Sequence, residues 1–392
     1  MTKQPSYRFE GYIESWEQRK LGEVGDFSIK TNSFSREKLS LNSGEIKNIH
    51  YGDILVKYNS TLDFENNSIP YVIDNDTKLT SDMFLKNGDI IFSDAAEDYS
   101  VGKCVELFNV SGNIVSGLHT IVCRPEIDFA RYFLGYYLNS NSYRQQVLPM
   151  VQGAKVSSIS KGNLSKTNIS FPSLLEQTAI GSFFQDIDQL ISLQQRKLEV
   201  LKEQKKTYLK LLFPAKGQTK PALRFAGFED EWKEVKLGEI IKSISSKNYI
   251  TEYSKEGNNP VIQQGDIPIV GFSDNKPFNN FSNVILFGDH TLSLFKPETP
   301  FLLATDGIKI LHSDLTTQSF LFIMLERYLP KSQGYKRHYS LLKNELSSLP
   351  SLPEQEAIGS FFQDLDKAIA KQEEKVNQLK ESKQTLLRKM FI

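Results

Sequence analysis

The chain has 392 residues, of which 39% are hydrophobic, 24% charged and 11% aromatic, an ordinary globular composition with room for two or three domains. No apolar run approaches the 18 or more residues of a membrane span and no secretory signal is visible, so we expect a cytoplasmic protein. Two cysteines offer neither a disulfide framework nor a zinc site, and a formal net charge of zero gives no overall sign of nucleic-acid binding.

The first predicted domain covers residues 1–172 and mixes short apolar runs with turns. Gly52–Val56 and Gly88–Phe92 each predict a turn that leads into a β-strand. Residues 111–124 predict another strand, and the aromatic segment 129–139 predicts a helix. A polar loop at 155–159 precedes a final strand, so the domain is predicted to be α+β.

Residues 173–213 predict one long helix. Ser173 and Glu176 have the spacing of a capping box and follow Pro172. Apolar residues then recur at alternating steps of four and three over more than four heptads, which indicates a coiled coil. At 1.5 Å per residue, roughly 40 residues form a rod of about 60 Å.

The second predicted domain covers residues 214–350 and opens with a short linker at 214–221. It is again predicted to be α+β. The predicted strands are 261–263, 267–270, 284–287 and 308–311, and the predicted helix is 320–329.

A second long helix is predicted at 351–392 because this segment repeats the first. The sequence Ala-Ile-Gly-Ser-Phe-Phe-Gln-Asp begins at Ala179 and again at Ala357, and the alignment continues without a gap to Phe213 and Phe391. The two copies are 178 residues apart (357 − 179).

The openings of the two globular parts also repeat. Trp16 and Trp232, which are 216 residues apart (232 − 16), each precede a Lys-Leu-Gly sequence. Between these shared segments the globular sequences are largely unrelated. The chain is therefore a tandem duplication in which a constant frame carries two different globular parts.

Gln194 and Gln372 lie near the middle of each helix on the apolar face. If the two helices pair antiparallel, these amides would meet and hydrogen-bond; a glutamine that only tolerates a hydrated gap is the alternative, at about even odds. Apolar residues beside this face favour extra helices from partner subunits, against the alternative that they pack on the globular parts. The residues assigned to helix pairing or partner docking are Ile180, Phe183, Phe184, Ile187, Ile191, Gln194, Leu198, Ile358, Phe361, Phe362, Leu365, Ile369, Gln372 and Val376.

Motifs for self-contained catalysis are missing from the sequence. There is no P-loop, no Gly-x-Gly-x-x-Gly, and no metal-ligand spacing among the five histidines. We therefore assign no catalytic residue, no metal and no cofactor to this chain. A nuclease would require an acidic metal site that the sequence does not reveal.

The repeated segments resemble the specificity subunit of type I restriction–modification enzymes. The resemblance rests on the openings at Trp16 and Trp232 and on Pro-x-x-x-Glu-Gln-x-Ala-Ile-Gly-Ser-Phe-Phe from Pro172 and Pro350, and it spans essentially the whole chain. It implies that each globular part is a target-recognition domain reading half of a bipartite DNA target. It also implies that the two helices pair antiparallel and set the gap between the half-sites. The alternative is a coiled-coil scaffold without DNA specificity.

The resemblance also implies partners. Double-stranded DNA would be bound together with two methyltransferase subunits, which use S-adenosylmethionine, and two motor–nuclease subunits, which use ATP and Mg²⁺. Because the first globular part is slightly acidic and the second nearly neutral, we expect the isolated chain to bind DNA weakly and more tightly with its partners.

Base edges are recognised by side chains with donors and acceptors, so we expect polar loop residues near glycines to contact DNA. For any single residue, an ordinary solvated loop is the alternative. Arg337 is predicted to pair with guanine, and Gln152 or Gln333 with adenine. The candidates are Ser93, Asp94, Glu97, Tyr99, Lys103, Gln152, Lys155, Ser157 and Ser158 in the first domain, and Thr305, Asp306, Lys309, Gln333, Lys336, Arg337 and Tyr339 in the second.

Overall fold

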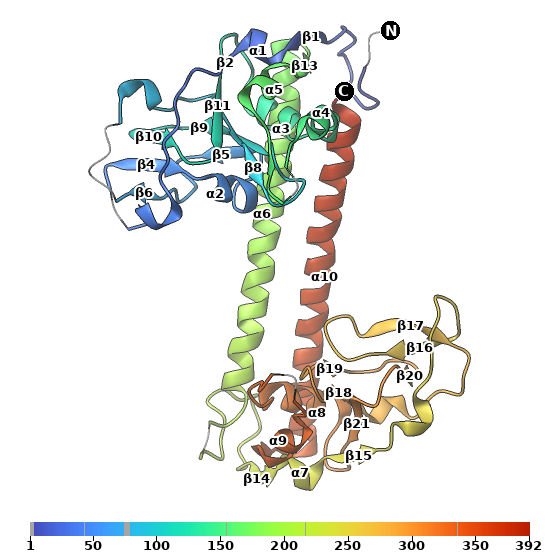
Figure 1. The fold of residues 1–392 in the computed structure, drawn as a ribbon. Helices are drawn as coiled ribbons and strands as arrows, with labels where there is room; N and C mark the ends of the chain where they lie inside the picture. The colour runs from blue at the N-terminus through green and yellow to red at the C-terminus, as the bar shows by residue number, and fades with distance from the viewer. Residues whose placement is uncertain (1–3, 43, 74–78, 154, 216, 335) are drawn as a thin grey trace. The chain divides into compact units, whose positions relative to one another are not determined.

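The computed structural model describes residues 4–42, 44–73, 79–153, 155–215, 217–334 and 336–392. The chain divides into two compact units, of which unit 1 comprises residues 1–194 and 375–392 and unit 2 comprises 195–374 (Figure 1). Each unit contains one globular part, the beginning of one long helix and the end of the other.

The two long helices are present as predicted. Helix α6 spans Leu174–Leu211 and helix α10 spans Leu352–Met390. Every residue assigned to the seam is buried or half-buried, and most residues on the other faces are exposed, which confirms the coiled-coil pattern. Gln372 is buried and Gln194 half-buried; that their amides meet remains a prediction.

The glutamates at the helix starts each bind an arginine from a distant segment. Glu176 receives two hydrogen bonds from Arg8, each 2.6 Å long, and Glu354 receives two from Arg224, at 2.7 and 2.8 Å. Both carboxylates are almost completely buried, so a bidentate guanidinium supplies the countercharge that burial requires. Each pair fixes the segment before the repeated tryptophan to the start of a long helix.

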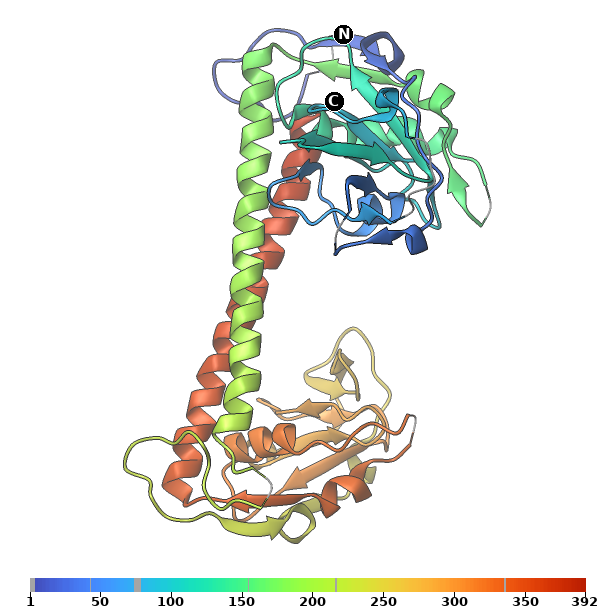
Figure 2. The same cartoon turned by 90° about the vertical axis from the view of Figure 1, so that its left-hand side faces the viewer.

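Unit 1 is built on two sheets with helices packed around them (Figures 1 and 2). In the five-stranded sheet only β5 and β9 run parallel, and the other neighbours are antiparallel. Its order is β2 (Gly25–Asp26), β11 (Thr120–Pro125), β7 (Ile90–Ser93), β9 (Cys104–Phe108) and β5 (Thr61–Asp63). The four-stranded sheet has the order β10 (Asn113–Ser116), β4 (Ile46–Ile49), β6 (Tyr71–Val72) and β3 (Leu39–Ser40). The helices are α1 (Leu21–Val24), α2 (Tyr51–Val56), α3 (Phe133–Leu138), α4 (Asn141–Val147) and α5 (Lys161–Ser165).

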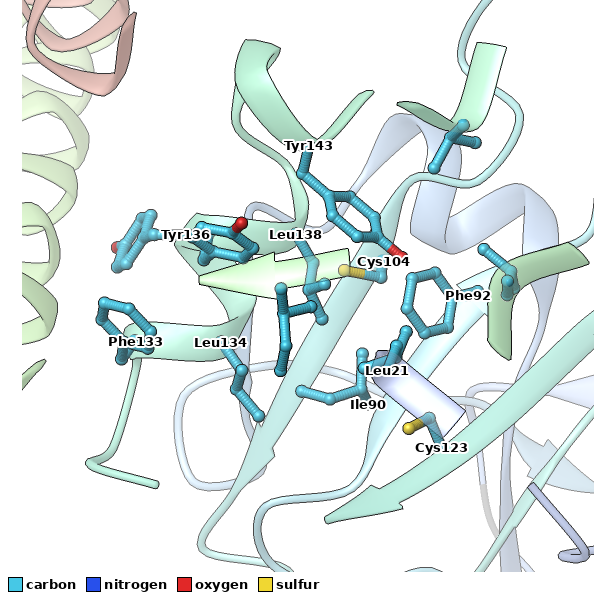
Figure 3. Close-up of a cluster of buried hydrophobic side chains, with 14 of the residues drawn as sticks. Leu21, Ile90, Phe92, Cys104, Cys123, Phe133, Leu134, Tyr136, Leu138 and Tyr143 are labelled. Carbon is cyan, nitrogen blue, oxygen red and sulfur yellow. The ribbon is translucent and has the colours of Figure 1, made fainter. Parts of the chain in front are cut away.

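A core rich in aromatic residues fills the space between the five-stranded sheet and the helices of unit 1. Figure 3 shows Phe92, Tyr143 and Leu21 with the two cysteines, Cys104 and Cys123. Both thiols are free and buried, and burial raises the pKa of each well above its ordinary value.

In the described residues, the globular part of unit 2 has smaller sheets and fewer helices than that of unit 1. Its four-stranded sheet has the order β15 (Lys242–Ile244), β21 (Ile308–His312), β18 (Ile285–Gly288) and β19 (Leu294–Phe295), all antiparallel. A three-stranded sheet has the order β17 (Ile269–Ser273), β16 (Asn259–Ile262) and β20 (Leu302–Leu303). The helices are α7 (Leu237–Ile240), α8 (Gln318–Arg327) and α9 (Tyr339–Asn344).

Both units close the globular part in the same way. In unit 1, β1 (Glu17–Lys20) pairs antiparallel with β13 (Asn168–Phe171), and in unit 2, β14 (Lys233–Lys236) pairs antiparallel with β22 (Leu346–Leu349). The first strand of each pair follows the repeated tryptophan, and the second leads into a long helix. The duplicated frame seen in the sequence is therefore also duplicated in the backbone.

The end of each long helix packs on the repeated tryptophan of its unit. Phe391 lies 6.5 Å from Trp16 between ring centroids in unit 1, and Phe213 lies 5.7 Å from Trp232 in unit 2. In unit 1 the end of α10 thus lies beside the start of α6 (Figure 2).

Equivalent ion pairs fix the direction of the helices within each unit. Lys383 of α10 pairs with Asp188 of α6 in unit 1 at 2.5 Å, and Lys205 of α6 pairs with Asp366 of α10 in unit 2 at 2.8 Å. Each partner in the second pair is the repeat counterpart of one in the first. The predicted antiparallel arrangement is therefore present in each unit.

One local prediction in unit 1 was wrong, and two others were met only in part. Gly52–Val56 forms helix α2, not a strand, because the His50 side chain accepts the Gly52 N–H at 3.1 Å and caps the helix. Residues 111–124 form two strands, β10 and β11, separated by a turn in which His119 has φ 55°.

The predicted helix at 129–139 is shorter than expected. Tyr132 has φ 72°, which ends helical geometry on its N-terminal side, so α3 begins at Phe133. The carboxylate of buried Glu106 accepts the N–H groups of Tyr132 at 3.2 Å and Gly135 at 2.7 Å. This acidic side chain from β9 satisfies the start of the helix, a long-range contact that a local pattern does not reveal.

Candidate DNA-recognition surface

In unit 1 the structure brings two predicted DNA-contact segments together. Strand β7 is followed by β8 (Ala95–Ala96), which pairs antiparallel with β12 (Ser157–Ser158). Gln152 and Ser158 exchange two main-chain hydrogen bonds, at 2.9 and 2.7 Å. The segment after β7 and the hairpin that holds Gln152 and Lys155 therefore form one surface.

Several candidates on this surface are accessible. Tyr99 is 85% exposed, and Glu97, Gln152, Lys155 and Ser158 are also exposed. These side chains are accessible for contact with DNA, whereas Ser157 is half-buried. Their roles at individual bases remain predictions.

Ser93 is not accessible. Its side chain is fully buried, and its hydroxyl donates to the Ala95 carbonyl at 2.8 Å, so it cannot reach a base edge from this position. Asp94 is half-buried beside His119, with 3.2 Å between Oδ1 and Nδ1, and burial raises the pKa of its carboxyl group. Both residues shape the loop more directly than they could contact DNA.

Unit 2 presents its recognition segment in the corresponding place. The Ile159 N–H donates to the Asp94 carbonyl at 2.9 Å in unit 1, and the His338 N–H donates to the Asp289 carbonyl at 2.8 Å in unit 2. The hairpin 152–158 and the segment 331–337 therefore occupy equivalent positions in the two frames. Both sequences contain Gln-Gly-x-Lys, which begins at Gln152 and at Gln333, and the residues around this motif differ.

His338, to which the sequence analysis assigned no role, holds the segment 331–337. His338 is fully buried; its Nδ1 lies 3.0 Å from the Asp289 carbonyl, and its Nε2 accepts the Gln333 N–H at 3.0 Å. Since Nε2 accepts, the ring proton is on Nδ1 and is donated to Asp289. The Asp289 carboxylate in turn accepts the N–H groups of His338 and Tyr339, at 2.8 and 2.7 Å.

Arg337 and Asp306 come from separate loops and lie together on this surface, with 3.7 Å between Nη2 and Oδ2. Both are largely exposed, as are Thr305, Gln333 and Lys336. Lys309 on β21 is half-buried, and Tyr339 is half-buried at the start of α9, where burial raises the pKa of its phenol group. The exposed side chains form a surface suited to contacts with base edges. Tyr339 instead helps to hold the loop, because its N–H donates to the Asp289 carboxylate.

The residues beside the helix seam divide into two kinds. Phe183 packs edge-on against Phe9 at 5.4 Å in unit 1, and Phe361 packs against Phe225 at 5.7 Å in unit 2. For these two the alternative reading, packing on the chain itself, is correct. Leu190 remains 40% exposed.

Among the residues that the structure describes, no group of three or more His, Cys, Asp or Glu side chains is placed to hold a metal ion. In the same residues no helix is long and apolar enough to cross a membrane.

Comparison with known proteins agrees with the duplicated frame. Residues 13–203 and 229–381 each match the family Methylase_S, described as "Type I restriction modification DNA specificity domain". In Methanocaldococcus jannaschii, the type I restriction enzyme MjaX specificity subunit is 25% identical over 333 residues, covering 76% of each chain. The MjaVIII specificity subunit of the same organism is 25% identical over 279 residues, covering 60% of this chain and 64% of that one.

Two solved structures share the fold. The type I restriction–modification S subunit of M. genitalium has a TM-score of 0.63 at 16% identity and covers 100% of this chain and 99% of its own. A structure concerned with complex assembly of a type I restriction–modification system has a TM-score of 0.55 at 18% identity, covering 96% and 97%. With the family matched twice over most of its length, the chain belongs to the specificity subunits of type I restriction–modification enzymes.

Proposed function

We propose that the chain reads a bipartite DNA target, with unit 1 recognising one half-site and unit 2 the other, as a non-catalytic subunit of a type I restriction–modification complex. One observation carries this proposal. Two equivalent frames, each with the same Arg–Glu pair, Trp–Phe contact and strand pair, carry globular parts whose sequences are otherwise largely unrelated. A scaffold without DNA specificity has no need of two different surfaces.

The test is to exchange the recognition segment of unit 2. Residues 331–339 are replaced by the corresponding segment of a relative with another specificity, and the chain is expressed with its methyltransferase partner. Mapping methylated adenines across the genome is expected to show a change in one half-site only. The matched control replaces Glu229–Glu231, an exposed segment outside the surface, and leaves both half-sites unchanged. An unchanged methylation map after the 331–339 exchange contradicts the assignment.

We infer that the partners supply all the chemistry: two methyltransferase subunits with S-adenosylmethionine, and two motor–nuclease subunits with ATP and Mg²⁺, in the cytoplasm. Support for docking comes from Leu190, Leu193 and Val200, which are 40%, 63% and 52% exposed on α6. Apolar residues exposed beside a helix seam suit further helices from a partner.

Docking is tested by making Leu190→Glu and Leu193→Glu together and measuring co-purification with the methyltransferase. We expect loss of the complex without loss of folding, because both side chains already face water in the isolated chain. Ser192→Glu, an exposed change between them, is the control and should leave assembly intact.

A further inference from the structure

A pocket of about 310 Å³ in unit 1 gathers three cationic side chains. Lys103 lies at the end of the segment that follows β8, Arg144 is on α4, and Lys383 is on α10. Tyr99 and Gln384 also line the pocket, and both are exposed. The pocket therefore adjoins the recognition surface of unit 1 through the segment that carries Tyr99.

Two of these cations are not neutralised. The Lys103 ammonium donates to the carbonyls of Leu55 at 3.0 Å and Tyr58 at 2.8 Å. The Arg144 guanidinium donates to the carbonyl of Tyr99 and to that of Val101 at 3.1 Å. Main-chain carbonyls satisfy the donors without carrying a countercharge, and within the described part of the chain neither residue forms an ion pair.

The surroundings make this excess of positive charge costly. Lys103 and Arg144 are each half-buried, and burial lowers the pKa of both. For Lys103, repulsion from Arg144 and Lys383 lowers the pKa further. Among the three cations only Lys383 forms an ion pair in the described part of the chain, with Asp188, and its side chain is 12% exposed. Asp98 raises the pKa of Arg144 but forms no ion pair with it. An anion entering the pocket would relieve the repulsion.

The repeat supplies an internal comparison. Lys205 is the counterpart of Lys383, and in unit 2 it pairs with two carboxylates, Asp366 and Glu326, each at 2.8 Å. Glu326 stands six residues after Phe320, which packs on the helix end of unit 2. Asn139 stands six residues after Phe133, which packs the same way in unit 1. Unit 1 thus has an amide where unit 2 has the second carboxylate, and it adds Lys103 and Arg144.

We propose that this pocket binds one phosphate group of the DNA backbone at the half-site read by unit 1. The inference rests on the proposed function and deepens it. A phosphate brings the missing negative charge, and the hydroxyl of Tyr99 provides a neutral donor of the kind that contacts DNA phosphates. Phosphate contacts fix register and orientation without specifying sequence, so the pocket would position unit 1 for its base contacts. It also shows how a chain with zero net charge can hold DNA locally.

The variant that tests the pocket is Gln384→Glu. Gln384 is exposed on α10 and nearly isosteric with glutamate, so the change places a carboxylate among the cations without disturbing the fold. Gln195→Glu, the same change at an exposed position of α6 that does not line the pocket, is the control. Arg144→Gln is the second variant and removes one cation directly.

The protein is used as the complex with its methyltransferase partner, on a duplex that carries the mapped target. We expect Gln384→Glu and Arg144→Gln to weaken binding about tenfold and to reduce the slope of log affinity against log salt by about one, with the methylated sequence unchanged. The control should bind like the unaltered complex.

A second measurement locates the contact. Each phosphate of the duplex is replaced in turn by a neutral methylphosphonate. One position within the first half-site should weaken binding by the unaltered complex and have no further effect on Gln384→Glu.

Three outcomes overturn the proposal. If Gln384→Glu keeps the affinity, the salt slope and the methylphosphonate profile of the unaltered complex, the pocket holds no phosphate. If Gln384→Glu instead blocks assembly with the methyltransferase while the profile of residual complex is unchanged, the occupant is an acidic side chain of the partner. Absence of sequence-specific binding by the unaltered complex would refute the proposed function itself, and this inference with it.

Discussion

At the scale of single residues, two buried polar side chains organise the surfaces on which recognition depends. His338 ties the 331–337 segment of unit 2 to Asp289, and Glu106 ties the start of α3 in unit 1 to β9. Neither faces a base. Each acts by accepting hydrogen bonds from main-chain N–H groups. Leaving one such buried group unpaired would cost about 1–3 kcal/mol.

The two bonds of His338 can be separated by substitution. A glutamine reaches about as far as Nε2 and can accept the Gln333 N–H, whereas an asparagine reaches about as far as Nδ1 and can only replace the bond to Asp289. We expect His338→Gln to keep discrimination at the second half-site within about threefold and His338→Asn to lose about tenfold, which methylation of duplexes with single mismatches would measure. The first half-site is the internal control. Equal effects of the two variants would mean that the Gln333 bond does not hold the segment.

Glu106 makes the stability of unit 1 depend on pH. Burial raises its pKa to about 8, although the amides of Tyr132 and Gly135 oppose the rise. Because this folded-state pKa lies above the ordinary value of 4.5, the protonated form stabilises the fold fully below about pH 4.5, and that contribution is lost as pH rises through 8.

We therefore expect the free energy of unfolding to fall by about 3 kcal/mol between pH 5.5 and pH 8, and expect Glu106→Gln to remove most of that slope. Urea unfolding at the two pH values measures both. Glu97→Gln, at an exposed position, should leave the slope unchanged. A slope that survives in Glu106→Gln assigns it to another group.

At the scale of elements, the paired helices are held by contacts that occur once in each unit but are not equally strong. Lys205 neutralises both Asp366 and Glu326, whereas Lys383 neutralises Asp188 alone. Burial opposes the charge on Lys205, yet Glu326 and Asp366 together raise its pKa. The seam of unit 2 therefore depends more on its lysine than the seam of unit 1.

Replacing each lysine by methionine tests this difference, since methionine keeps the length and apolar stem. We expect Lys205→Met to lower the stability of unit 2 by about 2 kcal/mol, because two carboxylates lose their partner, and Lys383→Met to lower that of unit 1 by about 1 kcal/mol at most. Each unit has one tryptophan, so urea unfolding followed by Trp232 fluorescence in a Trp16→Phe background reports on unit 2, and the converse background reports on unit 1. A larger loss from Lys383→Met would contradict the argument.

Elements also differ in how far the sequence predicts them. The long helices were predictable because a period of 3.5 residues persists over several heptads and occurs again in the second copy. The partner of Glu176, Arg8, could not be predicted because it is 168 residues away. Ser93 was placed on the DNA surface because its segment is polar, but it lies in β7, between β11 and β9, and is fully buried. Local sequence patterns reveal the period of a helix or strand and the residues of its turns. They do not reveal burial that results from contacts between residues far apart in the sequence.

At the scale of the whole molecule, the proposed role of the helices is to set the gap between half-sites. Helices α6 and α10 are 38 and 39 residues long, and each begins in one unit and ends in the other. Any change of length in both helices therefore alters how far along the DNA the second unit reaches.

Inserting one heptad into each helix adds about 10.5 Å, or about three base pairs at 3.4 Å per base pair. We expect the methylated motif to keep both half-sites and to show a longer gap in a genome-wide map. Substituting seven exposed residues without changing the length is the control, and it should leave the gap as it was. A gap that stays constant after the insertion would falsify the spacer role.

The two buried cysteines allow the opening of unit 1 to be measured by thiol labelling, because unit 2 contains no cysteine. Both thiols of the chain, Cys104 and Cys123, lie in the core of unit 1 with their ionisation suppressed, so a thiol reagent can react only when that core opens. The rate of labelling in native buffer thus reports the opening of one recognition domain while the other stays silent. Protection of these sulfurs when DNA is added would register ordering of the first domain by its half-site, with no dye or tag introduced.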